Sequence, residues 1–368
     1  MSCLRNMVSM ITKKDLQLFV FAITDSGPNK EFLSHYCTLL NPTGDSTTSN
    51  GKQTFVSKVA LFVKKIKKLL EKIGIDISPI VFNKVAKSLQ EKKFDLVIAF
   101  QEELATHFCS FFDQTRKIAW IHCDYARYLT SPKIISRNLS IYTGYEKIIC
   151  VSDYTCRNFL SVIPELEPKT RPLHNLINDT LIIEKSKEVV DLPWNDETFN
   201  IVSVGRFDRV KRYEYIPQLA SEIKKAGIKF KWVLLGGGNE VIKQEIHNSI
   251  SKYNVEDCVI LLGETNNPYP YIANSSLLVC LSSTEACPNV INEAKILHIP
   301  VVSANFGSVY EFLEDHINGI ITPMEKMGAA ITELALNKEL YERLKMNISS
   351  FKYDNDAIIC KLENDILI

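Results

Sequence analysis

The chain has 368 residues, of which 46% are hydrophobic and 23% are charged, a composition typical of soluble globular proteins. This length exceeds a single ordinary core and favours two domains of roughly 150–200 residues each. No apolar run approaches the ~18–20 residues of a membrane-spanning helix, and the first residues lack the apolar segment of a signal peptide. We therefore expect a cytoplasmic protein.

The charge is unevenly distributed, although 43 basic and 43 acidic residues leave the whole chain neutral. Residues 1–180 carry 24 Lys and Arg against 17 Asp and Glu, a charge of +7, so the remainder carries −7. A basic first half favours an anionic partner, and drift between two domains is the alternative. The basic residues are not interleaved with aromatic residues, so we expect no nucleic-acid partner.

A pass along the chain predicts an α/β protein. Residues 1–14 resemble the end of a helix, and the first strand is predicted at 17–24. Apolar, β-branched runs then alternate with helical patterns, which predicts buried parallel strands and two doubly wound domains. The first series of strands is 17–24, 94–100, 117–122 and 147–152, and the second is 199–204, 231–235, 258–262, 277–281 and 300–303.

Residues 55–73 give the clearest helical pattern, with one apolar stripe and many lysines around it. A basic amphipathic helix can lie on an anionic membrane surface, which would make the protein peripheral on the inner face of the membrane. A domain helix with its stripe in the core is the alternative, and it is the one that we favour.

A charged, proline-containing stretch at 185–198 predicts the linker between the domains. The first domain then covers residues 1–184 and the second covers 199–350. Residues 351–368 are predicted to form a terminal helix after a break at Ser349 and Ser350.

The strongest chemical signal is the segment from Glu285 to Glu293, followed by His298-Ile299-Pro300-Val301-Val302. Two carboxylates eight residues apart flank a predicted helix start, because Pro288 suits the first helical position. Glu285 would lie in the loop before the helix and Glu293 inside it. The backbone N–H groups of Asn289 and Val290 would favour a phosphate at the positive helix end.

A second signal follows the first strand of the second domain. Val204-Gly205-Arg206 and Lys211 occupy the carboxyl end of that strand, where open α/β sheets bind ligands. Gly205 permits a tight turn, and Arg206 and Lys211 can reach one diphosphate. Gly236-Gly237-Gly238 follows the next strand, and we interpret it as a strand-to-helix turn beside the donor, since neither GxGxxG nor a P-loop motif is present.

The ordered set VGR…K, GGG, E-x7-E and HIPVV resembles the donor domain of glycosyltransferase family 4, the glycosyl transferases group 1. The resemblance covers residues 198–345 well, and EFLEDHINGIITP from Glu311 to Pro323 extends it. The first domain matches more loosely, through FDLVIAF, WIHCDY and CVSDYT. The resemblance implies a GT-B fold, in which two Rossmann-like domains face a cleft and the last helix crosses back to the first domain.

The resemblance also implies roles for individual residues. Arg206 and Lys211 would bind the donor diphosphate, Glu285 the hydroxyls of the transferred sugar, and Glu293 the ribose. Backbone groups at Gly205, Gly236, Pro288, Asn289 and Val290 would line the donor site. His122, at the end of a first-domain strand, would face the reacting sugar, and a packed strand-end histidine is the alternative interpretation.

Two departures from the family pattern stand out. Ala286 replaces the glycine that usually follows the first glutamate, a mild change. The first domain also begins without the strand and glycine loop that open such domains, so we expect its first β-α unit to be missing, with activity in doubt.

We expect no metal or other cofactor. The ten cysteines show no CxxC pair or zinc-finger spacing and are interpreted as small buried apolar residues. Asp354-Asn355-Asp356 forms a DxD string, but it follows no strand and we interpret it as chance. Family resemblance implies metal-independent catalysis, with Arg206 and Lys211 stabilising the leaving group.

The sequence therefore predicts a retaining glycosyltransferase of the hexosyltransferase type. By analogy with the family, the donor would be a UDP-sugar and the acceptor a saccharide or lipid-linked molecule of surface polysaccharide synthesis. The alternatives are a non-catalytic nucleotide-sugar binding protein, and an epimerase or phosphorylase on the same fold.

Overall fold

A computed structural model describes residues 2–11, 16–22, 30–40, 78–128, 131–195 and 197–367 of the chain. These residues fall into two compact units, which are taken separately below. The first contains the residues up to Val151, together with Thr155–Leu176 and Ala357–Ile368, and the second contains Ser152–Tyr154 and Ile177–Asp356. The predicted helix at 55–73 lies outside the described residues, so its membrane role stays a prediction.

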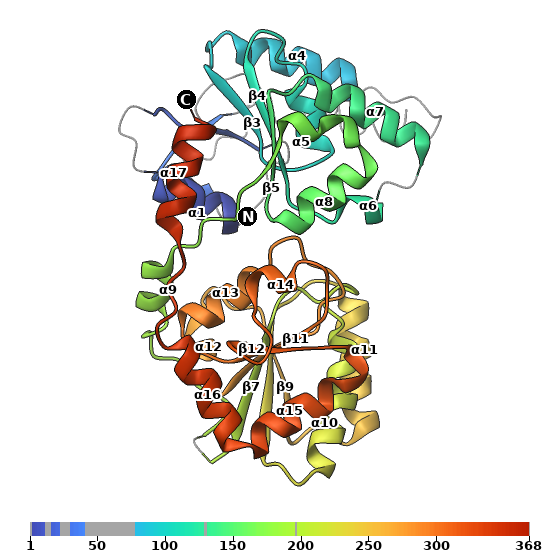
Figure 1. Cartoon of the computed structure of the whole chain (residues 1–368), viewed down its shortest axis with the longest axis vertical. Coiled ribbons are helices and arrows are strands. Elements are labelled where there is room, and N and C mark those ends of the chain that lie inside the picture. The colour runs from blue at the N-terminus through green and yellow to red at the C-terminus, as the bar shows by residue number, and fades with distance from the viewer. Residues whose placement is uncertain are drawn as a thin grey trace, which may run out of the picture. The chain divides into compact units, whose positions relative to one another are not determined.

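The first unit is built on parallel strands (Figure 1). One sheet has the order β3-β4-β5-β6 and a second pairs β1 with β2, and every pairing is parallel. The strands are β1 (Phe19–Phe21), β2 (Thr38–Leu40), β3 (Leu96–Ala99), β4 (Arg116–Ile121), β5 (Lys147–Cys150) and β6 (Thr170–Pro172). The first element of the described chain is a helix, α1 (Ser2–Met10), and the strand β1 follows it.

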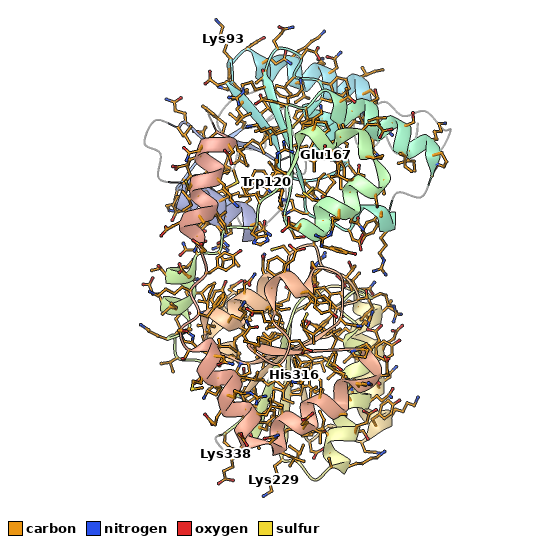
Figure 2. All side chains as sticks on the ribbon, in the orientation of Figure 1. Lys93, Trp120, Glu167, Lys229, His316 and Lys338 are labelled. Carbon is orange, nitrogen blue, oxygen red and sulfur yellow. The ribbon has the colours of Figure 1, made fainter. Side chains whose placement is uncertain are left out.

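Helices cover these strands because each places apolar side chains inward. Trp120 on β4 is 3% exposed, and Figure 2 shows it inside the first unit, whereas Lys93 lies at the periphery. The helices are α1, α2 (Lys30–Ser34), α4 (Ser78–Gln90), α5 (Leu104–Cys109), α6 (Tyr125–Tyr128), α7 (Pro132–Thr143), α8 (Asp153–Val162), the 3-10 helix η1 (Pro164–Lys169) and α17 (Asn355–Asp365). The helix predicted at 351–368 thus begins at Asn355.

The second unit is a six-stranded parallel sheet with the order β12-β11-β10-β7-β8-β9. Its strands are β7 (Phe199–Val204), β8 (Phe230–Leu235), β9 (Val259–Gly263), β10 (Leu277–Cys280), β11 (Val301–Ala304) and β12 (Gly319–Thr322). The chain runs outward from β7 to β9, then returns to β10 on the other side of β7. This reversal makes the carboxyl ends of β7 and β10 the switch point of the sheet, where ligands bind in such folds.

Both faces of this sheet are buried under helices (Figure 1). Along β8, Trp232 and Leu234 pack into one apolar cluster, and Val233 and Leu235 pack into another on the opposite face. The helices are α9 (Asp179–Lys185), α10 (Ile216–Lys225), α11 (Glu240–Tyr253), α12 (Tyr269–Ala273), α13 (Asn289–Ile296), α14 (Val309–Phe312), α15 (Met327–Leu336), α16 (Lys338–Ile348), and the 3-10 helices η2 (Tyr213–Tyr215) and η3 (Met324–Lys326).

Local sequence sets the ends of these helices. The Asn239 side chain accepts hydrogen bonds from the N–H groups of Val241 and Ile242 and so caps α11, which ends at Asn254 with a left-handed φ of 54°. Asn337 caps α16 in the same way.

The unit boundary lies between Leu176 and Ile177, so α9 and the predicted linker at 185–198 both belong to the second unit. Among the described residues, no helix combines the length and the apolar character needed to cross a bilayer. The ten cysteines, all of them within the described ranges, form no disulfide. Five of them are buried, whereas Cys360 is exposed and so departs from the expected burial.

Candidate nucleotide-sugar site

The switch point of the second sheet brings two distant loops together. The loop after β7 contributes Gly205, Arg206 and Lys211, and the loop after β10 contributes Glu285. The two strands are hydrogen-bonded neighbours, pairing Leu277 with Ile201. Side chains more than 70 residues apart along the chain can therefore meet at one sheet edge.

Lys211 and Glu285 form an ion pair at this edge, with the ammonium donating to Oε1. Each side chain retains only 18% of its exposure. Burial is the largest influence on Lys211 and opposes its charged form, but the surrounding groups, Glu285 first among them, together outweigh it and raise the pKa of the ammonium. The Lys211 ammonium is therefore stabilised in its charged form, and both side chains stay partly open to solvent.

Two predicted glycines lie beside this pair. A Cβ on Gly205 would lie 2.8 Å from the Tyr213 hydroxyl oxygen and 3.2 Å from Cε of Lys211. Gly236 has a φ of 145°, and a Cβ there would lie 1.9 Å from the Gly205 oxygen. The two loops after β7 and β8 approach so closely that only glycine fits at Gly236.

Arg206 lies apart from the pair. Its side chain is 84% exposed, and its guanidinium lies 3.5 Å from the Asp208 carboxylate. The guanidinium can therefore move toward a ligand, and its role as a diphosphate contact stays a prediction.

Helix α13 begins one residue later than its sequence indicated. Pro288 has a ψ of 80° and precedes the helix, and its carbonyl accepts the N–H of Ile291 at 3.0 Å. The N–H of Asn289 donates to the Cys287 carbonyl at 2.9 Å. Of the two amides expected to face a phosphate, that of Asn289 is thus engaged within its own loop.

Glu293 lies one turn into α13 and carries a perturbed carboxyl group. Burial raises its pKa to about 7, and the positive charge of Lys211 opposes that rise. Lys211 therefore interacts with both predicted carboxylates: it forms an ion pair with Glu285, and its charge opposes the rise in the pKa of Glu293.

Two residues that the sequence did not single out hold Glu285. The Ser282 hydroxyl donates to Oε1 of Glu285 at 2.7 Å, and the Ser308 hydroxyl donates to its backbone carbonyl at 2.7 Å. Ser282 lies three residues before Glu285 in the same loop, and this short spacing could have indicated a contact between the two side chains. Ser308 comes from the loop after β11, and no spacing rule points to it.

His122 follows β4 in the first unit, as predicted. Its ring lies 4.8 Å from that of Phe100, and its Nε2 is buried without a hydrogen-bond partner among the described residues. Burial lowers its pKa to about 4, so the ring is neutral at physiological pH. Its backbone N–H donates to Glu102, a carboxylate missed by the sequence, whose pKa burial raises.

The DxD string is explained by packing. Asn355 is buried, and its amide exchanges hydrogen bonds with the backbone of Ile177, accepting at 3.1 Å and donating at 2.8 Å. This amide connects the start of α17 with the backbone at Ile177.

A separate surface hollow of about 450 Å³ lies between η2, α10 and η3. Its lining includes Arg212, the neighbour of Lys211, but none of the predicted site residues. The chemistry of the switch point therefore does not extend into it.

Comparison with known proteins finds a family that the second unit resembles. Residues 184–350 match the family described as glycosyl transferases group 1. An uncharacterized glycosyltransferase of Methanocaldococcus jannaschii is 25% identical over 239 residues, which are 60% of this chain and 58% of the relative. The Campylobacter jejuni N-acetylgalactosamine-N,N'-diacetylbacillosaminyl-diphospho-undecaprenol 4-alpha-N-acetylgalactosaminyltransferase is 33% identical over 140 residues, 38% of this chain and 36% of that one. The chain thus spans about half the length of these relatives or less.

Among solved structures, Anabaena HepE in complex with UDP and glucose superposes with a TM-score of 0.75 at 16% identity. The match covers 99% of this chain and 95% of that one. Similarity at this identity establishes the fold, which is GT-B, as the sequence predicted. The chain thus has the GT-B fold, and its residues 184–350 are similar to the glycosyl transferases group 1.

Proposed function

We propose that this protein transfers a sugar from a nucleotide-sugar donor to a saccharide or lipid-linked acceptor, with retention of anomeric configuration. The observation that carries the proposal is the Lys211–Glu285 ion pair at the switch point of the second sheet. A half-buried cation there suits a diphosphate, and a half-buried carboxylate suits sugar hydroxyls.

A UDP-sugar is the donor that we propose. HepE, which shares the fold, was solved with UDP and with UDP-glucose. A saccharide or lipid-linked acceptor is supported by the named activity of the Campylobacter relative, and a role in surface polysaccharide synthesis by an amylovoran biosynthesis glycosyltransferase of Erwinia amylovora, 24% identical over 176 residues.

In the proposed reaction, the bond between the anomeric carbon and the diphosphate breaks as the acceptor oxygen bonds to that carbon from the same face. The acceptor proton passes to the departing phosphate oxygen. Arg206 and Lys211 stabilise the negative charge that develops on the diphosphate, so this chemistry needs no metal. Glu285 holds the transferred sugar, Glu293 holds the ribose, and neutral His122 contacts the reacting sugar.

The testing experiment measures binding and UDP release across a panel of nucleotide sugars, with saccharide acceptors present and absent. Wild-type protein is compared with Glu285→Gln and with Glu325→Gln, an exposed glutamate outside the site, as the matched control. We expect one donor to bind and turn over, and Glu285→Gln alone to suppress turnover. Binding without turnover would favour the non-catalytic alternative. Conversion of the donor without an acceptor would favour an epimerase, and a requirement for inorganic phosphate would favour a phosphorylase.

A further inference from the structure

Buried hydroxyl groups bind both the side-chain carboxylate and the backbone carbonyl of Glu285. Ser282 is 1% exposed and donates to the carboxylate, and Ser308 is fully buried and donates to the backbone carbonyl. Both hydrogen bonds measure 2.7 Å, the usual length for a hydroxyl donor. The glutamate therefore cannot change its loop conformation or its rotamer without breaking a buried contact.

The two donors to the carboxylate share one oxygen atom. Both Lys211 and Ser282 donate hydrogen bonds to Oε1 of Glu285. The Glu285 side chain keeps 18% of its exposure, so it is still partly open to solvent. Loading one oxygen with two donors fixes the plane of the carboxylate and leaves the second oxygen available for a ligand.

The two serines come from different parts of the second unit. Ser282 lies two residues beyond β10, and the Cys280 thiol lies 3.6 Å from its hydroxyl. Ser308 stands at the N-cap of α14, a position where serine normally caps its own helix. Its side chain makes no such cap and donates to Glu285 instead. The hydroxyl thus binds the loop of the site in place of the helix end.

We infer that Ser282 and Ser308 are positioning residues that fix Glu285 so that Oε2 faces the sugar of the donor. Ser282 sets the plane of the carboxylate, and Ser308 sets the path of the loop that carries it. This inference rests on the proposed function, in which Glu285 binds the transferred sugar and not the nucleotide.

The test compares the affinities of Ser282→Ala and Ser308→Ala for UDP and for UDP-glucose by calorimetry, together with turnover. We expect UDP affinity to stay at the wild-type level and turnover to fall about tenfold in Ser282→Ala, since one hydrogen bond to a charged group is lost. UDP-glucose affinity should fall in both variants. A merely structural serine would weaken UDP and UDP-glucose equally, and that result would overturn the inference.

Ser275→Ala is the matched control. Ser275 is also buried in the second unit, and its hydroxyl also donates to a carbonyl, that of Ile272 at 2.8 Å, but it touches no site residue. We expect it to leave binding and turnover unchanged. Ser282→Thr keeps the hydroxyl and should recover most of the selectivity for UDP-glucose over UDP.

A double-mutant cycle guards against misfolding of a single variant. If Ser282 acts through Glu285, Ser282→Ala should have little further effect in a Glu285→Gln background. Additive effects would overturn the positioning role. If Glu285→Gln itself leaves UDP-glucose turnover intact, the proposed function fails, whereas an effect of Glu285→Gln without one of Ser282→Ala removes only the present inference.

Discussion

Lys211 and Glu285, 74 residues apart in sequence, meet as an ion pair because β7 and β10 are adjacent strands of one sheet. The pair is half-buried, so removal of one member leaves the other partly desolvated and unpaired. This ion pair connects the loop after β7 with the loop after β10, on the two sides of the switch point.

Lys211→Met should lower turnover by about 100-fold or more, because a cation that stabilises the leaving diphosphate is lost. Steady-state kinetics with the identified donor measures this. Lys224→Met is the control, since Lys224 pairs with Asp257 at 2.6 Å on an exposed surface and should leave turnover unchanged. Equal turnover in Lys211→Met and wild type would contradict the role.

Gly236→Ala should abolish donor binding and lower stability by about 2 kcal/mol or more, through backbone strain and collision with Gly205. Gly227→Ala isolates the strain, because Gly227 has a φ of 80° and an added methyl group there would meet no atom within 4 Å. We expect a cost of about 1 kcal/mol there and normal binding. Chemical denaturation and calorimetry measure the two effects, and similar behaviour of both variants would refute the close approach.

Arg206→Ala should weaken donor binding and spare stability, whereas Arg209→Ala should lower stability and spare donor binding. Arg206 is 84% exposed, so its loss should change stability by less than about 0.5 kcal/mol while weakening donor binding. Arg209 donates to both carboxylate oxygens of Glu245, at 2.5 and 2.6 Å. Its loss should lower the thermal midpoint and leave donor affinity unchanged. Unaltered donor affinity in Arg206→Ala would remove this residue from the site.

Glu293 should make nucleotide binding depend on pH. Its pKa is raised from 4.5 to about 7, so between these values the folded state holds a proton that the unfolded state has lost. Stability contributed by this group is therefore present at low pH and declines as pH rises toward 7. If the carboxylate accepts ribose hydroxyls, UDP affinity should increase from about pH 6 to about pH 8. Calorimetry should show proton release in wild type and a flat profile in Glu293→Gln; a flat wild-type profile would contradict the assignment.

His122 should destabilise the folded state in acid. Its pKa is lowered from 6.5 to about 4, so the unfolded state binds a proton first as pH falls. Stability should therefore fall between pH 6.5 and 4, and His122→Gln should reduce that fall, as followed by the thermal midpoint. His316→Gln, at an exposed position, serves as the comparison. An identical acid profile in His122→Gln and wild type would show that the ring is not buried in solution.

The sequence predicted nine of the described strands, among them short ones such as β3 and β5, and missed three. β7 lies at 199–204 as expected, because a run of β-branched and aromatic residues buried on both faces has one plausible structure. Strands β2, β6 and β12 were missed. Each has three or four residues, and β6 contains Arg171 and Pro172, which carry no strand pattern.

The site was predictable where its parts follow strand ends. Motif order indicated Lys211 and Glu285, and strand adjacency brings them together. Ser308 was not predictable, because its contact with Glu285 depends on the tertiary path of the loop after β11. The engagement of the Asn289 amide by Cys287 likewise depends on the backbone angles of Pro288, which residue type alone does not determine.

The three tryptophans are divided between the units, and this gives each unit its own optical signal. Trp120 is buried in β4 of the first unit, while Trp194 and Trp232 belong to the second. When tryptophan is excited selectively, a Trp120→Phe protein would emit from the second unit, and its fluorescence during a denaturant titration would follow that unit. Subtracting this curve from that of the wild-type protein would yield the unfolding of the first unit, so the two stabilities become separately measurable within one intact chain.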